Sequence, residues 1–158
     1  MQYHQLLQLL NEGEPLTEED VVKVRKHVHP FRAKKKEILL YAGDSCDRIF
    51  FVNKGMIRAY FTNHKGADVT RMIATENCFM TNMISFKRLS VNNETIECLE
   101  DAELLIIKRH DLIAMLEDST LLRAKYCNFL EQYNAMHINP DYALDSLYKI
   151  ILASNPLQ

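Results

Sequence analysis

The sequence predicts a mainly β protein, a roll or sandwich of short strands with helices flanking it. Two observations lead to this fold class. Apolar residues recur at helical spacing near both ends of the chain, while the middle alternates short apolar runs with glycine-containing turns. Short strands separated by closely spaced turns are typical of all-β rolls and sandwiches.

Length, composition and charge limit the classes of function. With 158 residues, 47% of them hydrophobic and 25% charged, the chain has the size and composition of one ordinary globular domain. Its formal net charge of −2 gives no general attraction to nucleic acid or to an acidic membrane.

Two helices are expected in residues 1–30. The first covers residues 3–10, where the leucines form one apolar face. The second begins at Thr17, an N-cap residue, with Asp20 at the position that completes a capping box. Pro30 ends this helical pattern.

Residues 31–110 are expected to form the β-roll. Asn53-Lys54-Gly55 joins two runs of β-branched and aromatic residues and therefore predicts a hairpin. A second turn is expected at residues 63–66. The expected strands cover residues 36–41, 48–52, 56–61, 68–73, 95–99 and 102–107.

Residues 111–158 return to the helical period. A short helix carries Leu112 and Leu116, Ser119 caps a longer one, Asn139-Pro140 interrupts it, and a last helix is expected over residues 142–153. The longer helix has an apolar stripe that favours pairing with a second copy as a coiled coil. The alternative is that this stripe covers the protein's own roll. The stripe consists of Leu122, Tyr126, Phe129, Leu130 and Tyr133.

The order of elements, with its glycines, resembles the cyclic-nucleotide-binding domain of the CRP/FNR family of bacterial transcription regulators, in the form common in Bacteroidetes. The resemblance rests on Leu39 to Asp44, Ile49 to Arg58, Gly66 and Ile96 to Leu104, and it covers roughly residues 17–135. It implies a double-stranded β-helix, or jelly roll, followed by a C-terminal dimerisation helix. It also implies a homodimeric, ligand-sensing regulator rather than an enzyme.

Family members that bind cyclic AMP carry Phe-x-Gly-Glu-Leu in a phosphate cassette and Arg-Ser or Arg-Thr about ten residues later. In this chain Thr81-Asn82 and Asn92-Asn93 match those pairs. A buried cyclic phosphate needs an arginine for paired, charged hydrogen bonds, so we expect that cyclic AMP is not the ligand. The lining expected for a small-molecule pocket is Phe79, Met80, Thr81, Asn82, Met83, Asn92, Asn93 and Thr95.

Two alternatives stay open for this pocket. Lys87 and Arg88 lie within the cassette and could replace the missing arginine, which would make the chain a true cyclic-nucleotide sensor; the simpler interpretation is that both are solvated. The chain could also act as a protein-interaction module.

The resemblance also bears on DNA binding. Full-length family members continue into a helix-turn-helix, and residues 148–157 resemble the segment that leads into it, with Leu147 in place of the usual arginine. The sequence given ends at Gln158, so no sequence-specific DNA binding is expected of this chain alone.

Enzymatic and metal-dependent functions are the least favoured. His27-Val28-His29 followed by Glu37 is loosely similar to a metal cupin, but no third convergent ligand is evident, and we expect no catalytic residue, metal or cofactor. The four cysteines are scattered, which favours reduced thiols. No signal peptide or membrane span is recognised, so a cytoplasmic location is expected.

Overall fold

The protein is a β-roll made of two antiparallel sheets, as seen in a computed structural model that describes residues 2–138. One sheet has the strand order β1-β8-β3-β6 and the other the order β2-β7-β4-β5. The strands are β1 (His29–Ala33), β2 (Ile38–Leu40), β3 (Arg48–Lys54), β4 (Ile57–Thr62), β5 (Asp68–Ala74), β6 (Phe79–Met80), β7 (Thr95–Cys98) and β8 (Ala102–Lys108).

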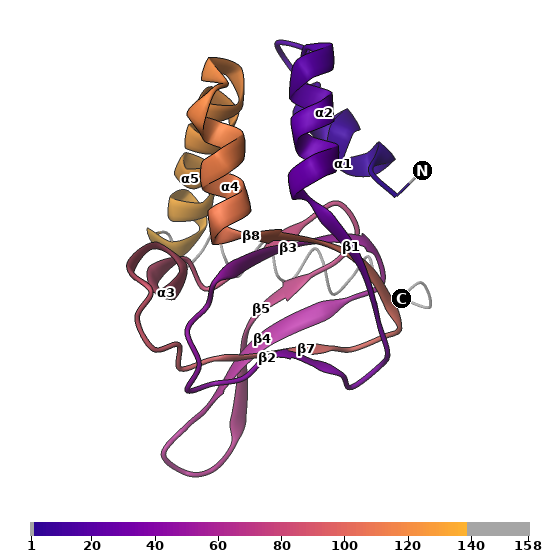
Figure 1. The fold of residues 1–158 in the computed structure, drawn as a ribbon. Helices are drawn as coiled ribbons and strands as arrows, with labels where there is room; N and C mark the ends of the chain where they lie inside the picture. Colours follow the sequence, from indigo (N-terminus) through magenta and orange to yellow (C-terminus); the bar gives the residue numbers. More distant parts are fainter. Residues whose placement is uncertain (1, 139–158) are drawn as a thin grey trace.

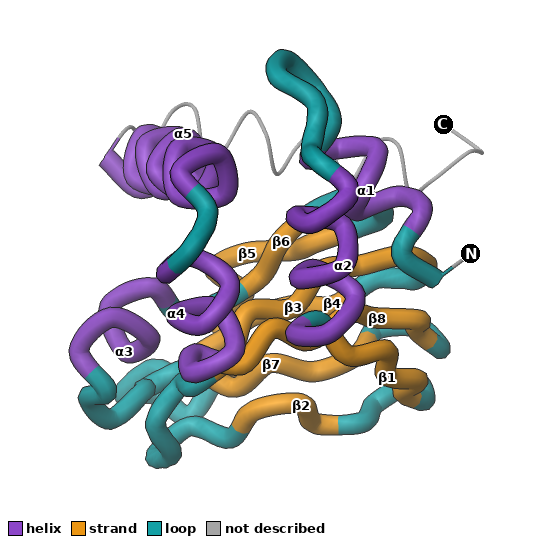
Figure 2. The backbone as a smooth tube through the Cα atoms, turned by 45° about the horizontal axis from the view of Figure 1, so that its top comes forward, coloured by secondary structure: helices purple, strands orange, loops and turns teal. Residues whose placement is uncertain are grey.

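Most helices gather over the sheet that contains β3 and β8. Figure 1 shows α1, α2, α4 and α5 above this sheet, whereas α3 lies at one side of the roll. Figure 2 shows the same helices from another direction; α4 contacts both α2 and α5. The helices are α1 (His4–Leu10), α2 (Glu18–His27), α3 (Met83–Arg88), α4 (Arg109–Glu117) and α5 (Thr120–Ile138).

The apolar run in β3 explains how roll and helices pack together. Ile49 to Val52 are all buried, as expected for a strand with one face in the roll and the other beneath helices. The tilted rings of Phe51 and Phe79 pack with centroids 4.9 Å apart, and Phe79 makes an edge contact with Phe129 of α5 at 5.0 Å. This aromatic series joins β3, β6 and α5 into one core.

The helix caps expected at Thr17 and Ser119 are confirmed, and a hydrogen bond links the two helix starts. The Thr17 hydroxyl accepts a hydrogen bond from the Asp20 backbone N–H, and the Asp20 carboxylate accepts one from the Thr17 N–H. The Ser119 hydroxyl accepts from the Leu122 N–H and donates to Asp20 at 2.7 Å. Burial raises the pKa of Asp20, but the hydrogen bonds from Ser119 and Thr17 outweigh it and leave the pKa below its ordinary value.

The hairpin expected at Asn53-Lys54-Gly55 is wrong. β3 pairs with β6 and β8, whereas β4 pairs with β5 and β7, so this turn carries the chain from one sheet to the other. Gly55 has a φ of +99°, and a Cβ added to it would lie 2.6 Å from the Asp101 carbonyl oxygen. Here glycine permits a close approach between backbones rather than a hairpin. The turn at residues 63–66, by contrast, does join the antiparallel pair β4 and β5.

Several elements were not expected from the sequence. β1 begins before the predicted strands and contains Pro30, which is tolerated because β1 is an edge strand that pairs only with β8 among the described strands. The two-residue β6 and the helix α3 were also missed. The helix expected over residues 142–153 and the Asn139-Pro140 break lie outside the described residues. Within residues 2–138, no helix has the length and apolarity needed to span a membrane.

Candidate ligand-binding site

The candidate site is built on the segment that runs from β6 through α3 to β7. Asn82 begins α3 as its N-cap, with its side-chain oxygen accepting from the Ser85 N–H at 3.1 Å. The Ser85 hydroxyl donates to the Ser90 carbonyl at 2.5 Å and accepts from the Cys46 N–H at 2.9 Å. The helix is therefore fastened both to the loop that follows it and to the loop before β3.

Asn82 and Asn92 lie side by side, although ten positions separate them. The Asn82 amide donates to Asn92 Oδ1 at 2.8 Å and to Glu94 Oε1 at 2.7 Å. Asn92 is only 1% exposed, and its amide donates to the Glu94 carbonyl oxygen. These hydrogen bonds tie the Asn82 and Asn92 amides to the protein itself.

A partly buried ion pair lies at the same place. Glu94 binds Arg71, which extends from β5, and the Glu94 side chain is only 6% exposed. Burial lowers the pKa of Arg71, but the hydrogen bond to Glu94, together with the interactions of Tyr133, raises it above its ordinary value. Sequence reasoning selected neither Arg71 nor the Glu94 carboxylate. The only available signal was that Glu94 stands two residues after the matched Asn92.

Tyr133 connects α5 to this network. Its hydroxyl donates to the Thr81 carbonyl oxygen at 2.7 Å, and the residue is 5% exposed. Burial raises the pKa of Tyr133 above its ordinary value, although Arg71 opposes this effect. The long C-terminal helix is therefore in direct contact with the start of the cassette.

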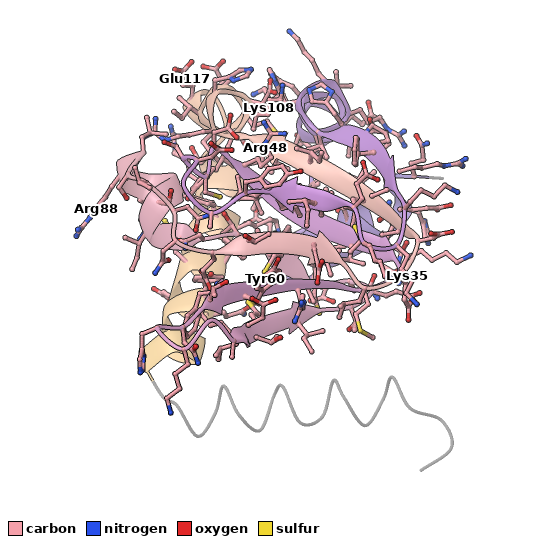
Figure 3. The ribbon with its side chains drawn as sticks, turned by 90° about the horizontal axis from the view of Figure 1, so that it is seen from below. Lys35, Arg48, Tyr60, Arg88, Lys108 and Glu117 are labelled. Carbon is pink, nitrogen blue, oxygen red and sulfur yellow. The ribbon has the colours of Figure 1, made fainter. Side chains whose placement is uncertain are left out.

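Beside this network lies a cavity of about 400 Å³. The charged residues that line it differ in their exposure to solvent. Glu94 is buried and Arg71 is half-buried, whereas Lys87 and Arg88 are exposed. Figure 3 shows Arg88 pointing away from the roll. The lining consists of Arg71, Asn82, Met83, Ile84, Lys87, Arg88, Glu94 and Tyr133.

The eight lining residues expected from the sequence have different surroundings. Asn82 and Met83 line the cavity, and Asn92 lies behind Asn82 in the network. Met80 is fully buried, and the Thr81 hydroxyl donates to the Arg48 carbonyl oxygen at 2.9 Å.

The remaining three lie around the cassette. Asn93 is exposed. The Thr95 hydroxyl accepts from the Ala42 N–H at 3.2 Å, and Phe79 packs against Phe129 on the helix side of the sheet.

The apolar stripe of α5 packs largely on the chain's own roll. Leu122 and Tyr133 are buried, and Phe129 contacts Phe79, while Tyr126 and Leu130 are half-buried. These contacts correspond to the alternative in which the stripe covers its own roll. Pairing of two copies through α5 stays a prediction.

The residues of the metal-cupin alternative do not converge. His27 Nδ1 lies 2.9 Å from Asp111 Oδ1, and His29 Nε2 lies 3.3 Å from Asp111 Oδ2. Glu37 instead accepts a hydrogen bond from the Lys34 N–H at 2.7 Å. In the part of the chain that the structure describes, no three His, Cys, Asp or Glu side chains are arranged to hold a metal ion.

Comparison with known families agrees with this geometry. The family model described as "Cyclic nucleotide-binding domain" matches residues 30–119, more than half of the chain, so the protein belongs to this family. No curated protein sequence matches the chain.

Solved structures share the fold at low sequence identity. A cyclic nucleotide-binding domain from Methylobacillus flagellatus aligns with a TM-score of 0.73 at 14% identity, over 99% of this chain and 85% of that one. The catabolite activator protein of Thermus thermophilus aligns with a TM-score of 0.68 at 21% identity, over 88% of this chain and 62% of that one. The sensor domain of the transcriptional regulator DNR from Pseudomonas aeruginosa aligns with a TM-score of 0.67 at 15% identity, over 87% of this chain and 95% of that one. The chain thus spans about three-fifths of the Thermus protein.

Proposed function

We propose that this chain is the ligand-sensing domain of a CRP/FNR-type transcription regulator, and that its cassette does not bind cyclic AMP. The observation that carries the proposal is the buried carboxylate of Glu94 beside Asn82 and Asn92. These two asparagines occupy the positions that the family resemblance matches to an acid and an arginine. In place of that acid and arginine, this chain has two amides that are hydrogen-bonded within the protein. The arginine at the cavity, Arg71, is already paired with Glu94.

A cyclic phosphate would be poorly stabilised in this cavity. It is an anion, so close to Glu94 it would meet a like charge of low exposure. Arg71 is already paired with Glu94, so a phosphate would compete with that carboxylate for the guanidinium. Lys87 and Arg88 are exposed, where an ion pair contributes only about 0–1 kcal/mol.

The proposed response to a ligand is a shift of α5. A molecule in the cavity would contact α3 and Tyr133 together, because both line it. If the molecule binds better to one arrangement of α3 and α5 than to another, it changes the populations of the two. In a homodimeric regulator joined through α5, that change would reach the partner and a DNA-binding region. The role is regulatory, and no catalytic step is assigned to the network.

A thermal-shift titration with cyclic AMP and cyclic GMP tests the proposal. A ligand at a hundredfold excess over its Kd stabilises the folded state by about 2.7 kcal/mol. We expect no shift at millimolar nucleotide. A saturable shift would contradict the proposal and support the second candidate, a true cyclic-nucleotide sensor, which is favoured by the position of Lys87 and Arg88 in the cavity lining.

If a shift is seen, a pair of variants tests whether Lys87 and Arg88 hold the nucleotide. Lys87→Ala with Arg88→Ala should abolish the shift if these side chains hold the phosphate. Lys34→Ala with Lys35→Ala serves as the control, because it removes the same charge from exposed positions outside the cavity lining.

A further inference from the structure

A second, apolar cleft lies between the N-terminal helices and α4–α5. Its volume is about 450 Å³. Ile49 and Ile107 contribute to its lining from the sheet, Leu9 from α1, Leu116 from α4 and Phe129 from α5. This is the side of the sheet on which Figure 2 shows α1, α2 and α5 gathered. The cleft is therefore enclosed mainly by side chains that cannot hydrogen-bond.

The size of this cleft is suited to a small molecule. An engineered apolar cavity of about 150 Å³ stays dry and takes up benzene. The present cleft has about three times that volume, within the range of small-molecule sites. Water gains few hydrogen bonds in such surroundings, whereas an apolar molecule would be stabilised by burial.

The polar residues of the lining come from α5, from Glu12 after α1 and from Asn77 and Cys78 before β6. Lys125 Nζ donates to the Glu12 carbonyl oxygen at 3.1 Å and so links α5 to the loop after α1. Asn128 and Gln132, three and seven residues further along α5, also line the cleft. Lys125, Asn128 and Gln132 thus add N–H donors to the lining.

We propose that this cleft binds a small amphiphile, an apolar body with one carboxylate end, in which the body lies against Phe129 and the carboxylate meets Lys125. This goes beyond the proposed function, because the cleft is separate from the cassette cavity.

The cleft also offers a route to the cassette. Among the described residues, Tyr133 is the one residue that lines both the apolar cleft and the cassette cavity. A molecule that moves α5 would therefore act on the hydrogen bond between Tyr133 and Thr81.

Decanoate is a suitable probe, used below its critical micelle concentration. We expect it to raise the melting temperature saturably and to displace the fluorescent sulfonate ANS from the folded protein. Cys78→Phe places a ring in the cleft lining and should weaken decanoate binding at least tenfold. Cys127→Phe is the matched control, because Cys127 is exposed on α5 and does not line the cleft. Lys125→Met should weaken decanoate binding severalfold and leave 1-decanol binding unchanged.

Several outcomes would overturn the proposal. One is the absence of a saturable effect of decanoate on the wild-type protein. Another is equal decanoate affinity in the wild type and Cys78→Phe, or in Leu116→Phe, which fills the cleft from α4 if Cys78→Phe does not fold. A dimer that Cys78→Phe disrupts, together with no decanoate binding, would assign the cleft to a second copy instead.

Discussion

The hydroxyl of Tyr133 donates a hydrogen bond to the Thr81 carbonyl oxygen at 2.7 Å, across 52 positions of the chain. This bond joins α5 to the residue just before the α3 N-cap. Thr81 is itself buried, and its hydroxyl is hydrogen-bonded to the Arg48 carbonyl. A buried hydrogen bond therefore connects α5 to the segment before α3. Losing such a bond costs folding free energy because it leaves a buried polar group unpaired.

Tyr133→Phe should destabilise the protein by about 1–3 kcal/mol, because it leaves the Thr81 carbonyl without this donor in a buried place. Tyr126→Phe is the control, since Tyr126 is half-buried on the same helix and has no hydrogen bond from its hydroxyl in the described structure. Its effect should stay within about 0.5 kcal/mol. Urea unfolding followed by circular dichroism measures both. Equal effects of the two substitutions would show that the hydroxyl of Tyr133 contributes nothing specific.

Gly55→Ala should destabilise the protein more than Gly43→Ala. Both glycines have φ near +100°, so both substitutions carry the cost of a left-handed alanine, about 1–2 kcal/mol. At Gly43 an added Cβ meets nothing within 4 Å, whereas at Gly55 it meets the Asp101 carbonyl oxygen at 2.6 Å. The overpacking adds about 1–3 kcal/mol. The difference between the urea midpoints of the two variants therefore measures the destabilisation caused by the close approach at Gly55. The prediction fails if the two variants are equally stable.

The sequence predicted most strands and helix starts, because these follow from local patterns. Thr17 and Ser119 are examples, since a capping residue acts on backbone groups within its own turn. The turn at Gly55 was misassigned for the same reason. A hairpin turn and a turn between sheets look alike locally, and only the pairing partners of β3 and β4 distinguish them.

The candidate site was predictable only in outline. The match of Asn82 and Asn92 to a cassette located the region, and the two amides do lie 2.8 Å apart. The Arg71–Glu94 pair was missed because its members come from β5 and from the residue before β7, and no short pattern connects them. The bond from Tyr133 was missed because helical periodicity shows that a residue is buried, but not what its polar atom contacts.

Cys127 should react first with a thiol reagent, and Cys98 should react only on unfolding. Burial, together with Glu37, Glu97 and Asp101, raises the pKa of Cys98 to about 11, so about one molecule in a thousand carries the reactive thiolate at pH 8. Cys127 is exposed on α5. A short pulse of N-ethylmaleimide followed by peptide mass spectrometry gives the order of labelling. Labelling of Cys98 as fast as Cys127 in the folded protein would contradict the packing of β7.

Asp111 should stabilise the fold in a pH-dependent way. Burial raises its pKa, but hydrogen bonds from His27 and His29 and the nearby His110 lower it below the ordinary value of 3.8. A carboxyl group with a lowered folded-state pKa stabilises the protein above its unfolded pKa, and this contribution is lost as the pH falls through the folded pKa. The gap in urea midpoint between wild type and Asp111→Asn should therefore shrink as the pH falls below 3.8.

The exposed Asp118 provides the comparison for that measurement. Asp118→Asn should change the urea midpoint little at any pH in the same range. A wild-type advantage over Asp111→Asn that grows as the pH falls below 3.8 would mean that Asp111 is not held as a carboxylate by the histidines.

Asn82→Glu combined with Asn92→Arg should create affinity for cyclic AMP. The two side chains already lie in contact beside the cavity, so the new carboxylate and guanidinium would be placed together where the family resemblance puts the cassette's acid and arginine. Adding Glu94→Gln should tighten binding further, because it removes the buried like charge that opposes a phosphate. The thermal-shift titration proposed for the wild type measures both variants, with a saturable stabilisation as the expected result.

A matched control places the arginine one residue away. Asn82→Glu with Asn93→Arg adds the same groups, but Asn93 is exposed, and the introduced guanidinium would remain in solvent and bind weakly. This variant should show no shift. If the double and triple variants are folded and also show none, Asn82 and Asn92 do not correspond to the cassette's acid and arginine. The proposal that their exchange removed cyclic AMP binding would then have to be abandoned, whatever the wild-type protein binds.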